Sequence, residues 1–119
     1  MRLSTLLPAT LFLAAPTSLL ALDEPPPPPE LAQASNDWGE CVQDRIDAAD
    51  EDLSPARTVD AALAACRPLQ ETMLAHHRRW VDGSSLSDRE KRDALRTMER
   101  SLTEVRPAFI RMVRQMRED

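Results

Sequence analysis

The most regular hydrophobic pattern in the chain lies between Ser87 and the C-terminus. Apolar side chains recur there at alternating steps of three and four residues, which places them along one side of an α-helix. Ser87 and Glu90 have the spacing of a capping box, which predicts the first turn. Pro107 is expected to bend this helix near Thr103. The residues of this apolar stripe, expected to face a core, are Leu95, Met98, Leu102, Val105, Phe109, Met112 and Met116.

Two further helical patterns precede this one. The first is expected to begin at Ser35 or Asn36, either of which can cap a helix. The second is expected to begin at Ser54, since a proline follows it and loses nothing at the first helical position. Pro68 should kink or restart the second helix, and Gly83 fits a left-handed terminating position. The apolar positions of the two helices are Trp38, Val42, Ile46 and Ala49, then Val59, Ala62, Leu63, Cys66, Leu69, Met73 and His77.

Composition narrows the fold class. The chain has 119 residues, which suits one small domain, and only 3% aromatic residues and 2 glycines. Sandwiches, barrels and glycine-rich nucleotide loops depend on those residues, so they are disfavoured. The predicted fold is all-α: a small disulfide-clamped three-helix bundle, or a helical hairpin plus a long C-terminal amphipathic helix.

The N-terminus has the pattern of a secretory signal. Arg2 is followed by an uncharged apolar stretch from 3 to 20, and prolines within it make a permanent span unfavourable. We expect residues 1–21 to be a cleaved signal peptide, 22–34 a Pro-rich linker and 35–119 the helical domain. The protein is then exported, periplasmic or secreted, and has no stable membrane span. Leu19 is a poor residue for cleavage after Ala21, so an uncleaved anchor stays open.

The two cysteines are expected to form a structural disulfide. Cys41 lies on the first predicted helix and Cys66 on the second, and oxidising compartments favour their pairing. Closing this loop of about 25 residues should stabilise the fold by about 3 kcal/mol. The alternative is a metal site that adds His76 and His77, but its spacing matches no usual zinc arrangement. We therefore expect no metal and no cofactor.

Part of the chain resembles a known group of proteins. Trp38, Gly39, Cys41 and Val42 come first, and a second run holds Asp60, Ala61, Ala62, Leu63, Cys66, Arg67 and Pro68. Together they look like small exported bacterial proteins with a paired-cysteine helical region and no assigned activity. The likeness covers about residues 37–70. It implies export, helices and a disulfide.

Charge divides the chain, which carries a net charge of −5. Residues 22–66 are strongly acidic and residues 67–119 are basic. The simplest interpretation packs the acidic first helix beside the basic third. The alternative is a surface for an anionic ligand or a partner, whose candidate residues are His76, His77, Arg78, Arg79, Trp80, Arg92, Arg96 and Arg100. Export and an acidic total disfavour nucleic acid.

These observations predict a function class only. No catalytic residue and no cofactor site is expected, so the first hypothesis is a non-enzymatic structural or protein-binding module of the cell envelope with an unknown protein partner. The alternative is an envelope-stress or chaperone-like factor that binds clients or anionic surfaces through the arginine-bearing C-terminal helix. A small helical enzyme using Glu71, Arg78 and Arg79 on an anionic substrate is the third hypothesis.

Overall fold

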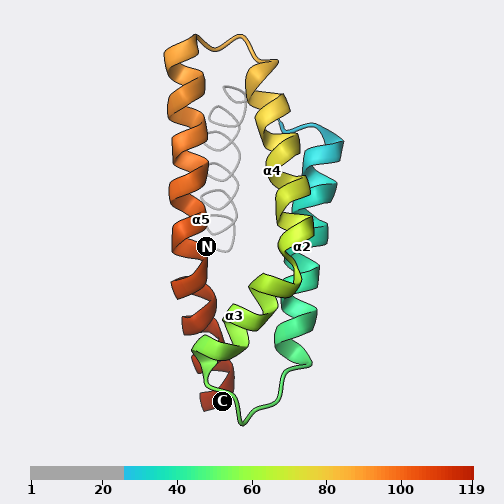
Figure 1. Ribbon diagram of the computed structural model, residues 1–119, viewed down its shortest axis with the longest axis vertical. Helices are drawn as coiled ribbons and strands as arrows, with labels where there is room; N and C mark the ends of the chain where they lie inside the picture. Colours follow the sequence, from blue (N-terminus) through green and yellow to red (C-terminus); the bar gives the residue numbers. More distant parts are fainter. Residues whose placement is uncertain (1–25) are drawn as a thin grey trace, which may run out of the picture.

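The computed structural model describes residues 26–119, which form an all-α structure. Its helices are α2 (Pro29–Asp47), α3 (Pro55–Ala65), α4 (Arg67–Asp82) and α5 (Asp88–Glu118). Figure 1 shows α3 and α4 as consecutive segments of one path, with α2 beside them and α5 returning along their other side. The all-α prediction is confirmed. The expected signal peptide, 1–21, and the first residues of the expected linker lie outside the described residues.

Helix α2 begins six residues before its expected start at Ser35. Pro29 occupies its first turn, where a proline sacrifices no hydrogen bond, and Pro28 precedes it in an extended conformation (φ −59°, ψ 152°). Leu31 and Ala34 are buried, with 6% and 7% of their surfaces exposed. They continue the apolar spacing of Trp38 toward the N-terminus. The last part of the expected Pro-rich linker, 29–34, is therefore helical and packed.

The second predicted helix is divided into α3 and α4. Ser54 caps α3 as expected, since its hydroxyl accepts a hydrogen bond from the Arg57 amide at 3.2 Å. The division falls at Cys66 (φ −97°, ψ 9°), two residues before Pro68. Pro68 cannot donate a helical hydrogen bond and would collide with the preceding turn of a continuous helix. The predicted restart is confirmed.

The end of α4 contradicts one expectation, and the start of α5 confirms another. Gly83 has φ −83° and ψ −2°, so its backbone lies in the right-handed helical region and not in the expected left-handed one. The chain leaves α4 without a left-handed residue because Ser84 closes the end, donating from its hydroxyl to the Val81 carbonyl at 2.6 Å. At the start of α5, both hydrogen bonds of the predicted Ser87–Glu90 capping box are present, at 3.2 and 3.0 Å. The helix is continuous through Pro107.

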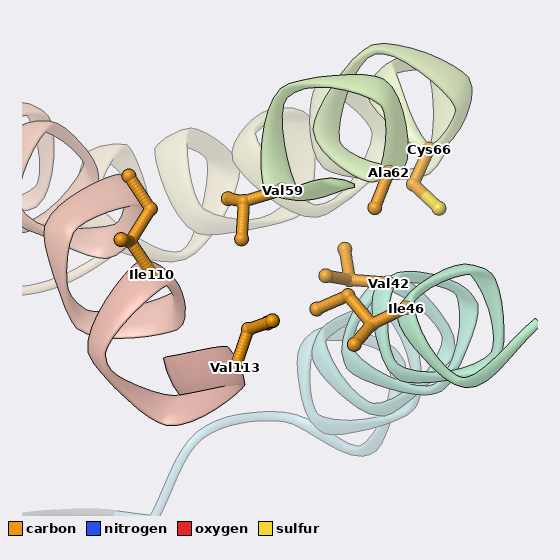
Figure 2. Close-up of a cluster of buried hydrophobic side chains, with 7 residues drawn as sticks. All are labelled: Val42, Ile46, Val59, Ala62, Cys66, Ile110 and Val113. Carbon is orange, nitrogen blue, oxygen red and sulfur yellow. The ribbon is translucent and has the colours of Figure 1, made fainter. Parts of the chain in front are cut away.

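The larger core cluster joins α2, α3 and α5. Its buried members point toward one another in Figure 2 and are Val42, Ile46, Val59, Ala62, Cys66, Ile110 and Val113. The predicted disulfide is present beside it, with the Cys41 and Cys66 Cα atoms 6.0 Å apart, and it covalently joins α2 to the α3–α4 junction. We call this part of the molecule the stapled end.

A smaller cluster lies between the start of α2 and the middle of α4. Leu31, Ala34 and Met73 are buried there, and Trp38, Trp80 and Leu102 pack against them half-buried. Trp38 also contacts the larger cluster, where its ring meets Phe109 edge-on with the centroids 6.3 Å apart. Trp38 therefore connects the two clusters.

The predicted apolar stripe of α5 is less buried than expected. Its first six residues are half-buried and Met116 is 46% exposed. None of the side chains from 88 to 109 is fully buried, and the buried residues of α5 are Ile110 and Val113. The expected core position of the stripe is thus only partly correct, because α5 turns a neighbouring face toward α3 after Pro107.

Candidate functional site

The surface cluster predicted on α4 is divided by the helix between two sides of the molecule. His76 and Arg79 lie together, with the His76 Nδ1 atom 2.8 Å from Arg79 Nη2. They line a shallow groove beside the start of α2, where Pro28 and Leu31 form the opposite wall. His77 and Arg78 face α5 instead. Arg78 and Arg79 therefore lie on different sides of α4 and do not converge on one ligand.

His77 occupies a partly buried position next to Trp80. The two rings meet edge-on with their centroids 6.1 Å apart. Burial, with a smaller contribution from the charge of Arg78, lowers the pKa of His77 below its usual value of 6.5. Its Nδ1 atom is buried and has no hydrogen-bond partner among the described residues. The surroundings of this histidine therefore favour its neutral form over the imidazolium.

A narrow crevice separates α4 from the first half of α5. Its volume is about 80 Å³, and its lining residues are Leu74, His77, Arg78, Leu95, Met98, Glu99 and Leu102. We call this part of the molecule the open end, because the side chains that α5 contributes to it are only half-buried or exposed. Drug-sized ligands occupy pockets of roughly 300–1,000 Å³, so this crevice suits single apolar side chains rather than a small molecule.

The basic side chains of α5 point mostly away from the crevice. At 100° per residue, Arg96 and Arg100 lie about 100–160° round the helix from Leu95, Met98 and Leu102, and all three of Arg92, Arg96 and Arg100 are exposed. The Lys91 ammonium donates to the Asp82 carbonyl at 2.8 Å and connects α5 to the end of α4. Arg96 and Arg100 therefore face away from the crevice, whose own charged lining residues are Arg78 and Glu99.

Two arginines that the sequence analysis did not single out attach α5 to α3. Arg106 donates twice to the Asp60 carboxylate, at 2.7 and 3.2 Å, and these hydrogen bonds lower the pKa of Asp60. Arg117 donates to the Leu53 carbonyl and, at 3.1 Å, to the buried Thr58 hydroxyl. The sequence contained a pattern that could have identified them. Positions 106, 110, 113 and 117 share one helical face, so the two arginines lie on either side of Ile110 and Val113.

The charge interaction expected between the first and third predicted helices takes a different form. The ion pair that α5 makes with another helix in the described part of the chain goes to α3, through Arg106 and Asp60. No ion pair there joins α2 to α5. Their ring contact, between Trp38 and Phe109, is apolar. The expected electrostatic pairing of acidic and basic helices is therefore wrong, because the α3–α4 path supplies the polar partners of α5.

The alternative metal site is also contradicted. Cys41 and Cys66 are joined in the disulfide, so neither supplies a thiolate ligand. Within residues 26–119, no group of three or more histidine, cysteine or acidic side chains is placed to hold a metal ion. His76 and His77 face different grooves, as expected for adjacent residues on a helix.

A wider groove lies between α2 and α4. It has a volume of about 480 Å³, and its walls include Glu30, Asp37, Leu69 and His76. Gln33 donates to the Asp37 carboxylate at 2.8 Å, and Thr72 donates to the Pro68 carbonyl at 3.1 Å. These local hydrogen bonds engage Gln33, Asp37 and Thr72, whereas the Glu30 carboxylate accepts none from the other described residues.

Comparison of the chain with models of known protein families, with curated proteins and with solved structures finds no match. Among the helices of residues 26–119, none has the length and apolar character needed to span a membrane.

Proposed function

We propose that this chain is an exported, disulfide-stapled helical module that binds a protein partner in the cell envelope, and that it is not an enzyme. The observation that carries the proposal is the unequal burial along α5. Ile110 and Val113 are fixed in the core of the stapled end, whereas Leu95 and Met98 remain half-buried at the open end. A helix held firmly at one end presents the apolar side chains of its other half on a rigid support.

Export is supported by two independent features. The apolar stretch after Arg2 has the pattern of a secretory signal. The Cys41–Cys66 disulfide suits an oxidising compartment.

Two measurements test this proposal. Intact mass of the protein purified from the envelope should correspond to a chain that begins at Leu22 and lacks two hydrogens. Chemical cross-linking in the envelope should then identify a protein that, once purified, forms a stoichiometric complex with this chain. A full-length chain with alkylatable thiols would contradict export, and failure to reconstitute any complex would contradict the binding role.

A chaperone-like role is the second candidate, favoured by the methionines on α5. Met98 and Met112 are half-buried and Met116 is exposed, and methionine adapts readily to varied apolar partners. Such a protein should suppress aggregation of several unrelated unfolded clients at similar ratios. A module for one partner should leave those clients unaffected.

A further inference from the structure

We propose that the first half of α5, residues 88–103, is a pH-sensitive flap that moves away from α4 when His77 takes up a proton. Pro107 is the hinge of this movement, which exposes the half-buried apolar side chains of the open end. The movement requires no partner, so it does not depend on the proposed binding function. Three features of the described residues support it: a weak point in α5, the sparse attachment of the flap to α4, and the surroundings of His77.

The hinge lies where α5 passes from loose to firm attachment. Pro107 has no amide hydrogen to donate to the Thr103 carbonyl, and helices bend most readily at such a position. After the proline, Ile110 and Val113 are buried in the larger core cluster. Immediately before it, Arg106 is hydrogen-bonded to α3. A bend between 103 and 106 therefore moves the first half of α5 while the second half stays in place.

The flap is held to α4 by few interactions. None of the side chains from 88 to 103 is fully buried, and a crevice of about 80 Å³ lies between the flap and α4. Within residues 26–119, its hydrogen bond to α4 is donated by Lys91 to the Asp82 carbonyl, at 2.8 Å. The connecting loop, 83–87, has five residues and spans roughly 17 Å when extended. The loop therefore permits the flap to separate from α4.

His77 lies on the α4 side of the crevice. Its Nδ1 atom is buried and has no hydrogen-bond partner in the described part of the chain, and its ring meets Trp80 edge-on. The charged side chains that line the crevice with it are Arg78 from α4 and Glu99 from α5, and α2 contributes none to this lining. Burial, and then the charge of Arg78, lower the pKa of the ring.

The proton and the flap are coupled through these surroundings. In the closed state, the Nδ1–H group of an imidazolium lacks an acceptor and has a like charge beside it, whereas water supplies an acceptor in the open state. The proton therefore binds the open state more tightly and raises its population at low pH. Glu99 opposes this effect in part, because its carboxylate attracts the imidazolium across the closed crevice.

Hydrogen exchange of the purified protein tests the movement. The measurement is resolved by peptide at pH 7.5 and 5.5 and corrected for the pH dependence of the intrinsic amide exchange rate. A helix of the flap's length is only marginally stable in water once it loses tertiary support, so its amides exchange in the open state. Residues 88–103 should therefore lose protection at pH 5.5, whereas residues 108–118 should keep it.

Matched variants assign the effect to its residues. His77→Gln cannot take up the proton and should abolish the loss of protection. The control, His76→Gln, removes the neighbouring histidine, which faces the groove beside α2, and should retain the loss. Glu99→Gln should enlarge it, and Pro107→Ala, which restores the missing hydrogen bond, should reduce it. Glu99 and Pro107 are exposed, so these two variants test the flap even if His77→Gln fails to fold.

Four outcomes would overturn the proposal. Equal protection of residues 88–103 at both pH values would show that the flap does not respond. An equal loss in residues 108–118 would show a general destabilisation instead of a hinge. Persistence of the loss in His77→Gln would assign the proton to another group. A gain of protection at pH 5.5 would show that the attraction between His77 and Glu99 closes the crevice. Because no partner is added, failure to find an envelope partner leaves each of these results unchanged.

Discussion

The stapled end and the open end use the same long helix in different ways. At the stapled end, α5 places Ile110 and Val113 among residues of α2 and α3, next to a disulfide. Arg106 and Arg117 fix that half of the helix to α3 and to the loop before it. At the open end, the apolar side chains of α5 are only half-buried and border a crevice. The difference shows that one amphipathic helix can be a core element over one half and keep its apolar side chains half-exposed over the other.

Removing the disulfide should have the largest effect on stability. It should also reduce the difference in stability between the stapled end and the open end. Replacing both cysteines by serine releases a loop whose ends are 25 residues apart, which costs about 3 kcal/mol of unfolding free energy. Chemical denaturation under oxidising conditions measures this loss. Wild-type protein treated with reductant should lose a similar amount. If the double variant is as stable as the oxidised wild type, the staple does not hold this end.

A matched pair of truncations should give the next largest effect. Ile46 is 6% exposed in the core of the stapled end, so Ile46→Ala removes buried surface and leaves a cavity, at a cost of about 2–3 kcal/mol. Leu95→Ala removes a similar number of atoms from the open end. Because Leu95 is half-buried, its loss should cost less than about 1 kcal/mol.

Urea denaturation of both variants gives the comparison directly. Equal losses would show that the open end is packed as tightly as the stapled end, and the case for a binding surface there would fail. A much smaller loss in Leu95→Ala than in Ile46→Ala would support it.

The stapled end also shows how far the sequence predicts the structure. Caps were predictable because they depend on local pairs: Ser54 before a proline, and Ser87 with Glu90. The heptad-like stripe of α5 predicted a helix correctly but not which half is buried. That depends on α3, which meets the face of Ile110 and Val113 through long-range contacts that no local pattern records.

The start of α2 and the candidate surface show the same limit. The proline run suggested an extended linker, yet Leu31 and Ala34 gain burial against α4, and this tertiary packing extends the helix to Pro29. On α4, four consecutive polar or charged residues suggested one surface. Helical geometry directs adjacent side chains about 100° apart, so His76 and His77 line different grooves.

Gly39 allows a stabilising change between the two ends. It lies inside α2, and a Cβ atom built there would meet no other atom within 4 Å. Gly39→Ala should therefore raise the unfolding free energy by about 0.5–1 kcal/mol, since alanine loses less backbone freedom on folding. Thermal denaturation measures the gain. A loss of stability would mean that a close approach at Gly39 is part of the fold.

The smallest expected effect is on the pH dependence of the unfolding free energy. It arises from His77 at the open end. The folded-state pKa of His77 lies below 6.5, the value of an ordinary histidine, because burial and then Arg78 disfavour the imidazolium. Below pH 6.5 the unfolded chain therefore binds the proton more readily than the folded one. The stabilisation from neutral His77 is fully present above pH 6.5 and is lost as the pH falls through the folded-state pKa.

Replacing His77 with glutamine removes this titration while leaving His76 in both proteins. Denaturant unfolding at pH 8, 7, 6 and 5 should show a shallower fall in unfolding free energy for His77→Gln than for the wild type. The difference should arise below pH 6.5 and should be small, because the ring is only partly buried and Glu99 lines the same crevice, where it partly offsets the charge of Arg78. Parallel curves would place His77 in solvent-like surroundings. A difference confined to the acidic side would instead show that packing against Trp80 partly removes this ring from water even at the open end.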